Sequence, residues 1–580
     1  MDTILWMFRT QDPFALALTV IFGLVINLIL FNIDFITLAF RKAYLAIKGD
    51  SFVPHRFGEL PSGLIVIPSL LRNEEDYQGI IGTLQSCSNN NYPNNLIIIV
   101  SVDGNKENPE LYQRLIDWMN NYQHPDNIRL HITYNDKRLS KMMAIETGVN
   151  HMHQLIKEGK YDSFPPIYFS IDADGTLSEH ALERLATKLT TRHWITGNYR
   201  KVVAGNPMVP TTEVFKDWKE FFTVRGQNNI NIARQFLLAN LHRANLSPVP
   251  FIALPGAIYT TWSQVIINAP KITGYLQTIG FMDWVKWWLG KPLPKISEVN
   301  AEPLPEALTG STDDTSIGIV ASLSWWKDGK LEFDAPRSPI HAFGRMLREW
   351  FIERSHGHDM HARAYTFTPP TMRGLWLQRI RWNSSRVEVS GRFSKAFLFW
   401  WECGSAFLTT LARILANLFY TIVIYCVVPF FFMVGSNHIM YGIIFGYFFN
   451  MFCTSLYVVI ACAITPESRA YLKVLYAAPI AWIYTLCFEF GPAAVGVVKD
   501  IFFFGTNVRF CPEWTLIKGK SSRVAVLFRI RRFISMCFRS VVYGDVPFGS
   551  WWFGWREHEP YVKSGYHGWT SGKRASYNLK

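Results

Sequence analysis

The chain has 580 residues, of which 49% are hydrophobic and 15% aromatic, and its 58 Lys and Arg outnumber its 45 Asp and Glu to give a net charge of +13. This length and composition exclude a disordered chain and a small disulfide-stapled domain, and they allow two to four domains of roughly 100–200 residues. The mean hydropathy lies just above zero, which is high for a soluble enzyme and low for a chain embedded in a membrane throughout. We therefore expect a soluble domain joined to membrane-spanning helices.

The first apolar run covers residues 14–31 and continues to Phe40. A helix that crosses a bilayer core of about 30 Å needs on the order of 20 apolar residues, and this run is too long for a signal peptide. We predict one N-terminal transmembrane helix within residues 1–50. Three basic residues follow the run, namely Arg41, Lys42 and Lys48. By the positive-inside rule, the domain that comes next is expected in the cytosol.

Residues 51–390 contain no apolar run long enough to span a membrane, but they contain four runs with the length and composition of buried β-strands. These runs are Leu64–Pro68, Leu96–Val102, Ile128–Thr133 and Ile167–Ile171. Helical patterns lie between them, one starting at Asn73 and one over Ser140–His153. The alternation predicts a mostly parallel α/β sheet flanked by helices, which binds ligands at the carboxyl ends of its strands.

Acidic residues follow two of the predicted strands. Asp103 comes directly after the second strand, and Asp172 and Asp174 come after the fourth. Carboxylates are hard oxygen ligands for Mg²⁺ or Mn²⁺, and such a metal usually reaches a protein through one or two carboxylates plus substrate phosphates. A lone Asp-x-Asp is more often a turn or a helix N-cap, but its place directly after a buried strand favours the metal-binding interpretation.

Apolar segments return in residues 391–505. Phe393–Glu402 mixes aromatic and basic residues, as expected of a helix in the plane of the lipid headgroups. Three segments that follow are long enough to span, namely Phe407–Val434, Ile439–Ile464 and Tyr471–Phe504. Residues 506–580 form a strongly basic tail that is expected in the cytosol, which requires an even number of crossings before it. Either the last of the three segments forms two short or broken passes, or one segment is re-entrant.

Several motifs, taken in chain order, resemble the family 2 glycosyltransferases with a GT-A fold, and within them the membrane-embedded processive synthases of cellulose, chitin and hyaluronan. The most specific match is Tyr365–Trp382, where a Gln-x-x-Arg-Trp motif follows a Thr/Pro segment just before the spanning helices. Lys141–Gly148 is similar to the family's Lys-x-x-Ala-Leu-Asn-x-Gly helix, and Leu64–Asp76 to its first strand and Asn-Glu-Glu turn. Leu254–Tyr259 resembles the segment that lines the acceptor site.

The resemblance implies a role for each matched residue. Nucleotide-sugar binding is expected of Ser69, Glu74, Asp103, Lys141, Asp172, Gln378, Arg381 and Trp382. Acceptor binding is expected of Leu254, Pro255, Gly256 and Trp382. Asp174, assisted by Asp172, is expected to bind Mg²⁺ or Mn²⁺. For two of these residues a purely structural role stays open: Arg381 would also suit the surface of a helix, and Trp382 would also suit a packed core.

Ser311–Asp314 resembles the Thr-Glu-Asp motif that supplies the catalytic base of the family. Transfer with inversion needs one carboxylate to take the proton from the attacking hydroxyl, and positive charge to neutralise the departing diphosphate. We predict Asp314 as this base, with Asp313 as its neighbour, since two adjacent carboxylates raise one pKa toward neutral pH. The alternative is a helix N-cap before Ile317–Val320.

Four further segments differ from the family pattern or match it loosely. The tail segment Cys511–Lys520 loosely resembles the family's gating loop, with Trp514, Thr515 and Lys518 as its candidate residues, although the basic tail would also suit contacts to anionic headgroups. Thr261–Gly310 is longer than the usual connection and would form a lid or a membrane-contacting loop. His356, His358, His361 and Asp359 are predicted to form a solvated turn before Tyr365 and not a zinc site. A single N-terminal span replaces the two that are common in such synthases.

As a whole, the resemblance predicts a multi-pass enzyme of the plasma (cell or inner) membrane with a cytosolic catalytic domain. It would polymerise a UDP-sugar into a β-linked extracellular polysaccharide and pass the product through its own helices. Its expected partners are the UDP-sugar donor, the growing polysaccharide acceptor and the lipid bilayer, but no nucleic acid, and a homo-oligomer or accessory secretion subunits stay open. The alternatives are a non-processive transferase that adds one sugar to a lipid, a GDP-linked donor, and a scaffold subunit with an inactive transferase domain.

Overall fold

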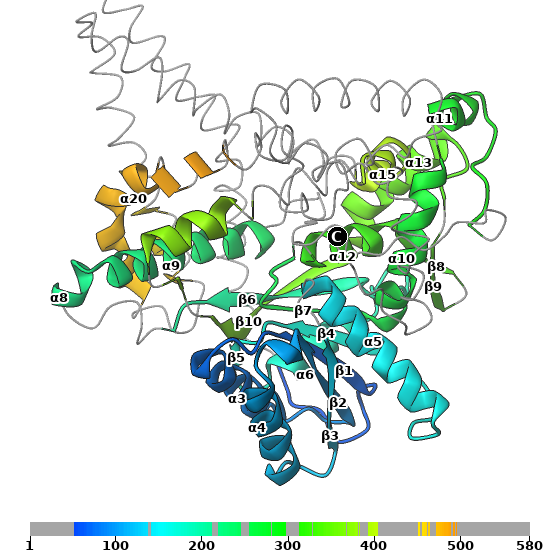
Figure 1. Ribbon diagram of the computed structural model, residues 1–580. Helices are drawn as coiled ribbons and strands as arrows, with labels where there is room; N and C mark the ends of the chain where they lie inside the picture. The colour runs from blue at the N-terminus through cyan, green and yellow to red at the C-terminus, as the bar shows by residue number, and fades with distance from the viewer. Residues whose placement is uncertain are drawn as a thin grey trace, which may run out of the picture. The chain divides into compact units, whose positions relative to one another are not determined.

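The fold was analysed in a computed structural model (Figure 1). It describes residues 52–136, 141–210, 218–244, 254–279, 281–296, 313–327, 329–333, 335–366, 368–369, 371–380, 382, 393–403 and short stretches between 451 and 495. The chain divides into two compact units. The smaller unit comprises Met1–Phe52, Thr211–Ser247 and Tyr420–Leu486, and the larger unit comprises Val53–Pro210, Pro248–Phe419 and Cys487–Lys580.

The larger unit is built on an eight-stranded sheet, counted over the residues that the structure describes, with the order β3-β2-β1-β4-β7-β6-β10-β5. Its strands are β1 (Gly63–Ser69), β2 (Leu96–Asp103), β3 (Ile128–Asn135), β4 (Ile167–Ile171), β5 (Thr176–Leu177), β6 (Val202–Met208), β7 (Ile258–Trp262) and β10 (His356–Tyr365). Strands β1 to β4 pair in parallel, as do β6 and β10, whereas β7 runs antiparallel to β4 and β6, and β5 to β10. The predicted mostly parallel sheet and its four predicted strands are confirmed.

The central strands form because runs of aliphatic residues can be buried on both faces of a parallel sheet. Every residue of β1, β2 and β4 is buried. Successive side chains of a strand point to opposite faces. Leu64 and Val66 therefore join one hydrophobic core, and Ile65 and Ile67 join the core on the other face.

Helices cover both faces of the sheet (Figure 1). On the face of Ile65 lie α3 (Glu74–Ser88), α4 (Pro109–Asn121) and α6 (Ala181–Thr190), and on the face of Leu64 lie α5 (Lys141–Lys157), α10 (Ser263–Thr278) and α12 (Asp313–Leu323). Helix α3 starts where the sequence predicts, because the Asn73 side chain accepts a hydrogen bond from the Asp76 backbone N–H at 2.9 Å. Helix α5 also forms as expected and extends one turn beyond His153. A mostly parallel sheet with flanking helices fits the GT-A arrangement.

Apart from the short 3₁₀-helix η1 (Asn105–Glu107) after β2, the remaining described elements of the larger unit follow β7 in the chain. They are α11 (Phe281–Trp288), the antiparallel hairpin of β8 (Ser324–Lys327) and β9 (Lys330–Phe333), α13 (Pro339–Arg348), a π-helical turn over Glu349–Glu353, and α15 (Ser394–Phe399). Part of the insertion expected as a lid or membrane loop is thus α10, whose Val265, Ile272 and Tyr275 are buried in the core. For α10 that expectation is wrong, because its apolar side chains pack on the sheet.

Two further expectations are corrected by burial. Phe393, Phe399 and Trp400, predicted in the headgroup plane, are at most 1% exposed, because their rings pack inside the core, as that of Phe399 does against Trp287 at 5.4 Å. The predicted solvated turn at His356–His361 is instead part of β10. This strand pairs with β6, and His358 is buried.

The smaller unit contains α8 (Trp218–Phe221), α9 (Val224–Ala244), the 3₁₀-helix η5 (Leu472–Ala477) and α20 (Ala478–Thr485). The rings of Trp218 and Tyr476 meet edge to face at 4.9 Å and join α8 to η5. Over the described residues, no helix combines the length and apolar character needed to cross a membrane. The predicted spans at 14–40 and 407–434 lie outside these residues, and those at 439–464 and 471–504 are described only in part.

Candidate nucleotide-sugar site at the carboxyl edge of the sheet

The four parallel strands β1 to β4 end at the same edge of the sheet. Ser69, Asp103 and Asn135 are the last residues of β1, β2 and β3, and Asp172 follows the last residue of β4. Asp103 and Asn135 are direct register partners. The structure therefore brings three of the residues predicted to bind nucleotide sugar to one edge, together with an amide that the sequence had not singled out.

Asp103 belongs to a buried chain of hydrogen bonds. Asn135 Nδ2 donates to Asp103 Oδ1 at 2.9 Å, and Thr147 Oγ1 donates to Asn135 Oδ1 at 2.8 Å. Both Asp103 and Asn135 are buried. Gly104 follows with a φ of 87°, a left-handed conformation that favours glycine, and its N–H donates to the Asn135 carbonyl at 2.8 Å. The carboxylate that the resemblance assigns to the nucleotide base is thus held in a fixed orientation.

Helix α5 connects this network of hydrogen bonds to the acidic residues Asp172 and Asp174. It approaches the sheet closely at Gly148, where an added Cβ would lie 2.4 Å from Val66 Cγ1, which explains why glycine occupies this position of the motif. Lys141 is the first residue of the helix, and its Nζ lies 2.6 Å from Asp172 Oδ1. Both side chains are about one-third exposed, at 32% and 31%. The cation and the carboxylate therefore remain accessible to a ligand.

Asp172 and Asp174 lie in a loop that α3 holds in place. Thr83 Oγ1 donates to the Ala173 carbonyl at 2.8 Å, and the Gly175 N–H donates to the Asp172 carbonyl at 3.1 Å. Asp174 is exposed, yet enough protein surrounds its carboxyl to remove part of its hydration, and this effect and then the charge of Asp172 raise its pKa to about 6. The neighbouring carboxylate of Asp172 would give a bound cation a second oxygen ligand.

The acidic pair fits Mg²⁺ or Mn²⁺ as a two-carboxylate ligand set. Within the described part of the chain, no group of three or more His, Cys, Asp or Glu is arranged to bind a metal ion. A metal held by Asp172 and Asp174 would therefore need further oxygen ligands from a bound diphosphate or from water. This is the usual coordination of Mg²⁺ at phosphate-binding sites.

The predicted acceptor segment lies at the same edge. Leu254 and Pro255 are buried and Gly256 is half-buried. Pro255 accepts a hydrogen bond from the Ile258 N–H at 3.2 Å. Because β7 is antiparallel to β4 and Ile258 pairs with Ile171, the start of β7 stands beside the end of β4, next to Asp172.

The predicted catalytic base and the Gln-x-x-Arg-Trp motif are described in part. Asp313 and Asp314 open α12, so the segment begins a helix as the alternative expected, but their side chains lie outside the described residues. Gln378 is half-buried on a helical stretch over 372–380, and its Oε1 is buried without a hydrogen-bond partner in the described part. Arg379, which the sequence analysis missed, places its guanidinium 4.5 Å from the ring centre of Trp382. One face of that ring is thus covered by a cation.

Two predicted site residues, Ser69 and Glu74, have side chains that bond within the protein, and some others are not described. The Ser69 hydroxyl donates to the Ile67 carbonyl at 3.2 Å. Glu74 is exposed on α3 and accepts hydrogen bonds from Arg114 Nη1 at 2.8 Å and Gln78 Nε2 at 2.9 Å, and the first of these lowers its pKa. Its carboxylate is thus engaged with helix α4, and its nucleotide-binding role stays a prediction. Four predicted site residues lie outside the described residues, namely Arg381, Trp514, Thr515 and Lys518.

Comparisons with known proteins give weak matches. No protein-family model and no curated protein matches the chain. Among solved structures, the mannosyltransferase PcManGT from Pyrobaculum calidifontis in complex with GDP-Man and Mn²⁺ is 13% identical, with coverage of 80% of this chain and 99% of that chain and a TM-score of 0.37. The structure of GalNAc-T7 with UDP, GalNAc and Mn²⁺ is 14% identical, with coverage of 26% and 24% and a TM-score of 0.18. Similarities at this level assign no function.

Proposed function

We propose that the protein is an inverting glycosyltransferase that uses a nucleotide-diphosphate sugar as donor. The observation that carries the proposal is the arrangement at one sheet edge of a buried, oriented Asp103 and the accessible trio of Lys141, Asp172 and Asp174. A nucleotide base offers N–H groups to a carboxylate, whereas a diphosphate needs cations. At this edge Asp103 provides the carboxylate for the base, and Lys141 at the start of α5 provides a cation for the diphosphate.

In this mechanism the residues of the chain bind, orient and move one proton. Asp103 accepts hydrogen bonds from the base, in the orientation that Asn135 fixes. Lys141 donates to the diphosphate and stabilises the negative charge that develops as the bond to the sugar breaks. Asp172 and Asp174 would hold Mg²⁺ or Mn²⁺, which supplies further positive charge to the leaving group when bound. Asp314 takes the proton of the attacking acceptor hydroxyl.

Within this function we favour a processive synthase that polymerises a UDP-sugar and passes the product across the plasma membrane through its own helices. Two sequence features support this choice. The Gln-x-x-Arg-Trp motif precedes the long apolar segments between 407 and 504, and a basic tail follows them. A growing polysaccharide would then be the acceptor, and the partly buried Gln378 would bind a sugar or phosphate oxygen.

The decisive experiment measures nucleotide release by the full chain from a panel of UDP- and GDP-sugars in the presence of Mn²⁺. We expect release with one donor class, its loss in Asp314→Asn, and retained UDP binding in that variant. Asp126→Asn is the matched control, because Asp126 is exposed just before β3, at the opposite edge of the sheet. Full activity of Asp314→Asn would contradict the assignment of the base, and absence of release from every donor would favour an inactive scaffold.

Sizing the labelled product separates the two enzymatic alternatives. A long polymer supports the processive synthase. A product that carries a single sugar on a lipid supports the non-processive transferase.

A further inference from the structure

Helix α13 exposes an apolar face that the glycosyltransferase function does not explain. Ile340, Phe343 and Leu347 of α13 and Phe351 of the π-helical turn that continues it recur at the spacing of one helical face. They are 86%, 47%, 38% and 64% exposed. The opposite face of the helix is buried, with Ala342 fully buried in the core. A helix that turns a row of large apolar side chains to solvent normally has a partner there.

The apolar face continues over α11 and α15. Met282, Trp288 and Leu289 of α11 and its end are 54%, 50% and 76% exposed. Trp401 joins them to α13, since its ring centre lies 6.0 Å from that of Trp288 and 6.5 Å from that of Phe343. We call this continuous patch, together with Leu398 of α15, the α11–α13 surface.

The charges around the α11–α13 surface are of one sign. Over residues 281–296 and 335–354, the exposed charged residues are Lys286, Lys291, Lys295, Arg337, Arg348 and Arg354. The acidic residues that the structure describes in these two ranges are less exposed: Glu349 and Glu353 are buried, and Asp283 is half-buried. The apolar patch is therefore bordered by cations.

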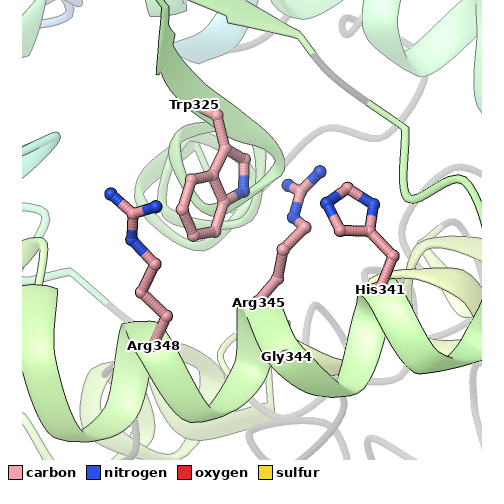
Figure 2. Close-up of a pocket in the computed structure, with 5 residues that line it drawn as sticks. All are labelled: Trp325, His341, Gly344, Arg345 and Arg348. Atoms are coloured by element: carbon pink, nitrogen blue, oxygen red, sulfur yellow. The ribbon is translucent and has the colours of Figure 1, made fainter.

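A pocket on the flank of α13 is lined by two arginines of that helix, the buried Arg345 and the exposed Arg348 (Figure 2). It has a volume of about 280 Å³ and is lined by Trp325, His341, Gly344, Arg345 and Arg348. Arg345 stacks 4.4 Å from the Trp325 ring centre and pairs with the buried Glu402 at 2.8 Å. Arg348, 49% exposed, lies one turn further along the helix and pairs with the buried Glu353 at 2.7 Å. Going around α13, a buried face is thus followed by a cationic flank and then by an apolar, exposed face.

We propose that the α11–α13 surface docks into the headgroup region of a bilayer that contains anionic lipids. A helix in that position buries its apolar face at the acyl boundary and keeps its cations at the depth of the phosphates. A second copy of the chain is a poorer occupant, because a symmetric contact would bring like-charged residues such as Lys291 and Arg337 of the two copies together. The proposal is independent of the proposed catalytic function. Its surface shares the outward-facing Leu398 and Trp401 with Phe393–Glu402, whose Phe393, Phe399 and Trp400 are buried, and it takes α11 from the segment expected as a lid or a membrane-contacting loop.

The test places an environment-sensitive fluorescent amino acid at position 340 of the full chain, reconstituted in phosphatidylcholine vesicles with or without phosphatidylglycerol. Position 195 is the matched control, because Ile195 is also an exposed isoleucine of the larger unit, 57% accessible, and lies outside the patch. We expect spin-labelled lipid to quench the probe at 340 and aqueous iodide not to reach it. At 195 the two quenchers should act in the reverse order.

A second arm tests the charges. Replacing Lys291 and Arg337 by Gln should abolish the increase in lipid quenching that phosphatidylglycerol causes at position 340, whereas Lys160→Gln, at a 59% exposed side chain outside the patch, should leave it unchanged. Spanning helices would keep every variant on the vesicle, so the readout is local to the surface. Iodide quenching at 340 equal to that at 195 would overturn the proposal. Protection of 340 from both quenchers would also overturn it, because protein would then cover the surface.

Discussion

Asn135 offers the sharpest test of the proposed nucleotide site, because it acts on the ligand only through Asp103. The substitution Asn135→Ala removes the hydrogen bond from Nδ2 to Asp103 Oδ1, which is 2.9 Å long. A hydrogen bond to a charged group contributes about 1.5–3 kcal/mol. If that free energy fixes the carboxylate in the orientation that binds the base, its loss should weaken nucleotide binding by about 10- to 100-fold.

Calorimetric titration of the full chain with UDP and GDP measures this change directly. Asn127→Ala is the control, since Asn127 precedes β3 at its other end and donates to the Tyr92 and Asn94 carbonyls at 2.9 Å and 2.8 Å. It should lower stability to a similar degree while leaving the nucleotide affinity unchanged. Equal affinities of wild type and Asn135→Ala would refute the role of Asp103 as an oriented base-binding carboxylate. Equal weakening in both variants would show that the effect is only one of stability.

Three further results are expected. The raised pKa of Asp174, about 6, means that its carboxyl holds a proton below that pH. The affinity for Mn²⁺ should therefore fall by about tenfold per pH unit below 6 and stay level above it. A Mn²⁺ titration of Asp174→Asn should lack this pH dependence. Lys201→Met leaves the buried Glu349 carboxylate without the cation that lies 3.3 Å away. It should lower the free energy of unfolding by about 3–5 kcal/mol, measured as a shift of the denaturation midpoint. The same substitution at the exposed Lys157 should not shift the midpoint. Gly148→Ala forces a methyl group against Val66 and should cost about 1–3 kcal/mol and weaken nucleotide binding; unchanged values would show that α5 moves aside at no cost.

The central sheet could be predicted from the sequence because its strands are runs of aliphatic, mostly β-branched residues, as in Leu96–Val102. Strand β10 could not, since His356–Tyr365 is rich in His and charged residues and its place in the sheet depends on pairing with β6. Phe393–Glu402 was assigned to the membrane surface because composition alone does not tell an aromatic core from an aromatic interface. Only the tertiary packing against Trp287 makes that distinction.

Some residues of the candidate site could likewise be predicted from the sequence, and others could not. Asp103 and Asp172 could be predicted because each directly follows a run typical of a buried strand, and Lys141 because its segment resembles a helix motif of the family. Asn135 carries no charge, and its importance depends on the register that pairs it with Asp103. That register is set by the whole length of β2 and β3, which no local pattern in the sequence encodes. The cation over Trp382 was likewise unpredictable, because Arg379 stands at one of the two variable positions of the motif and only its place three residues before Trp382 on the helix brings it over the ring.

Helix α5 fixes the spacing between the two ends of the candidate site. Thr147 connects it to the chain of hydrogen bonds at Asp103, and Lys141 connects it to the acidic pair. These residues are six positions apart on one helix, a rise of about 9 Å, and Gly148 locks the helix against β1. The two ends of the site therefore cannot move independently. If the site binds a nucleotide-diphosphate sugar as proposed, this fixed spacing would set how far apart the base and the phosphates of the donor must lie.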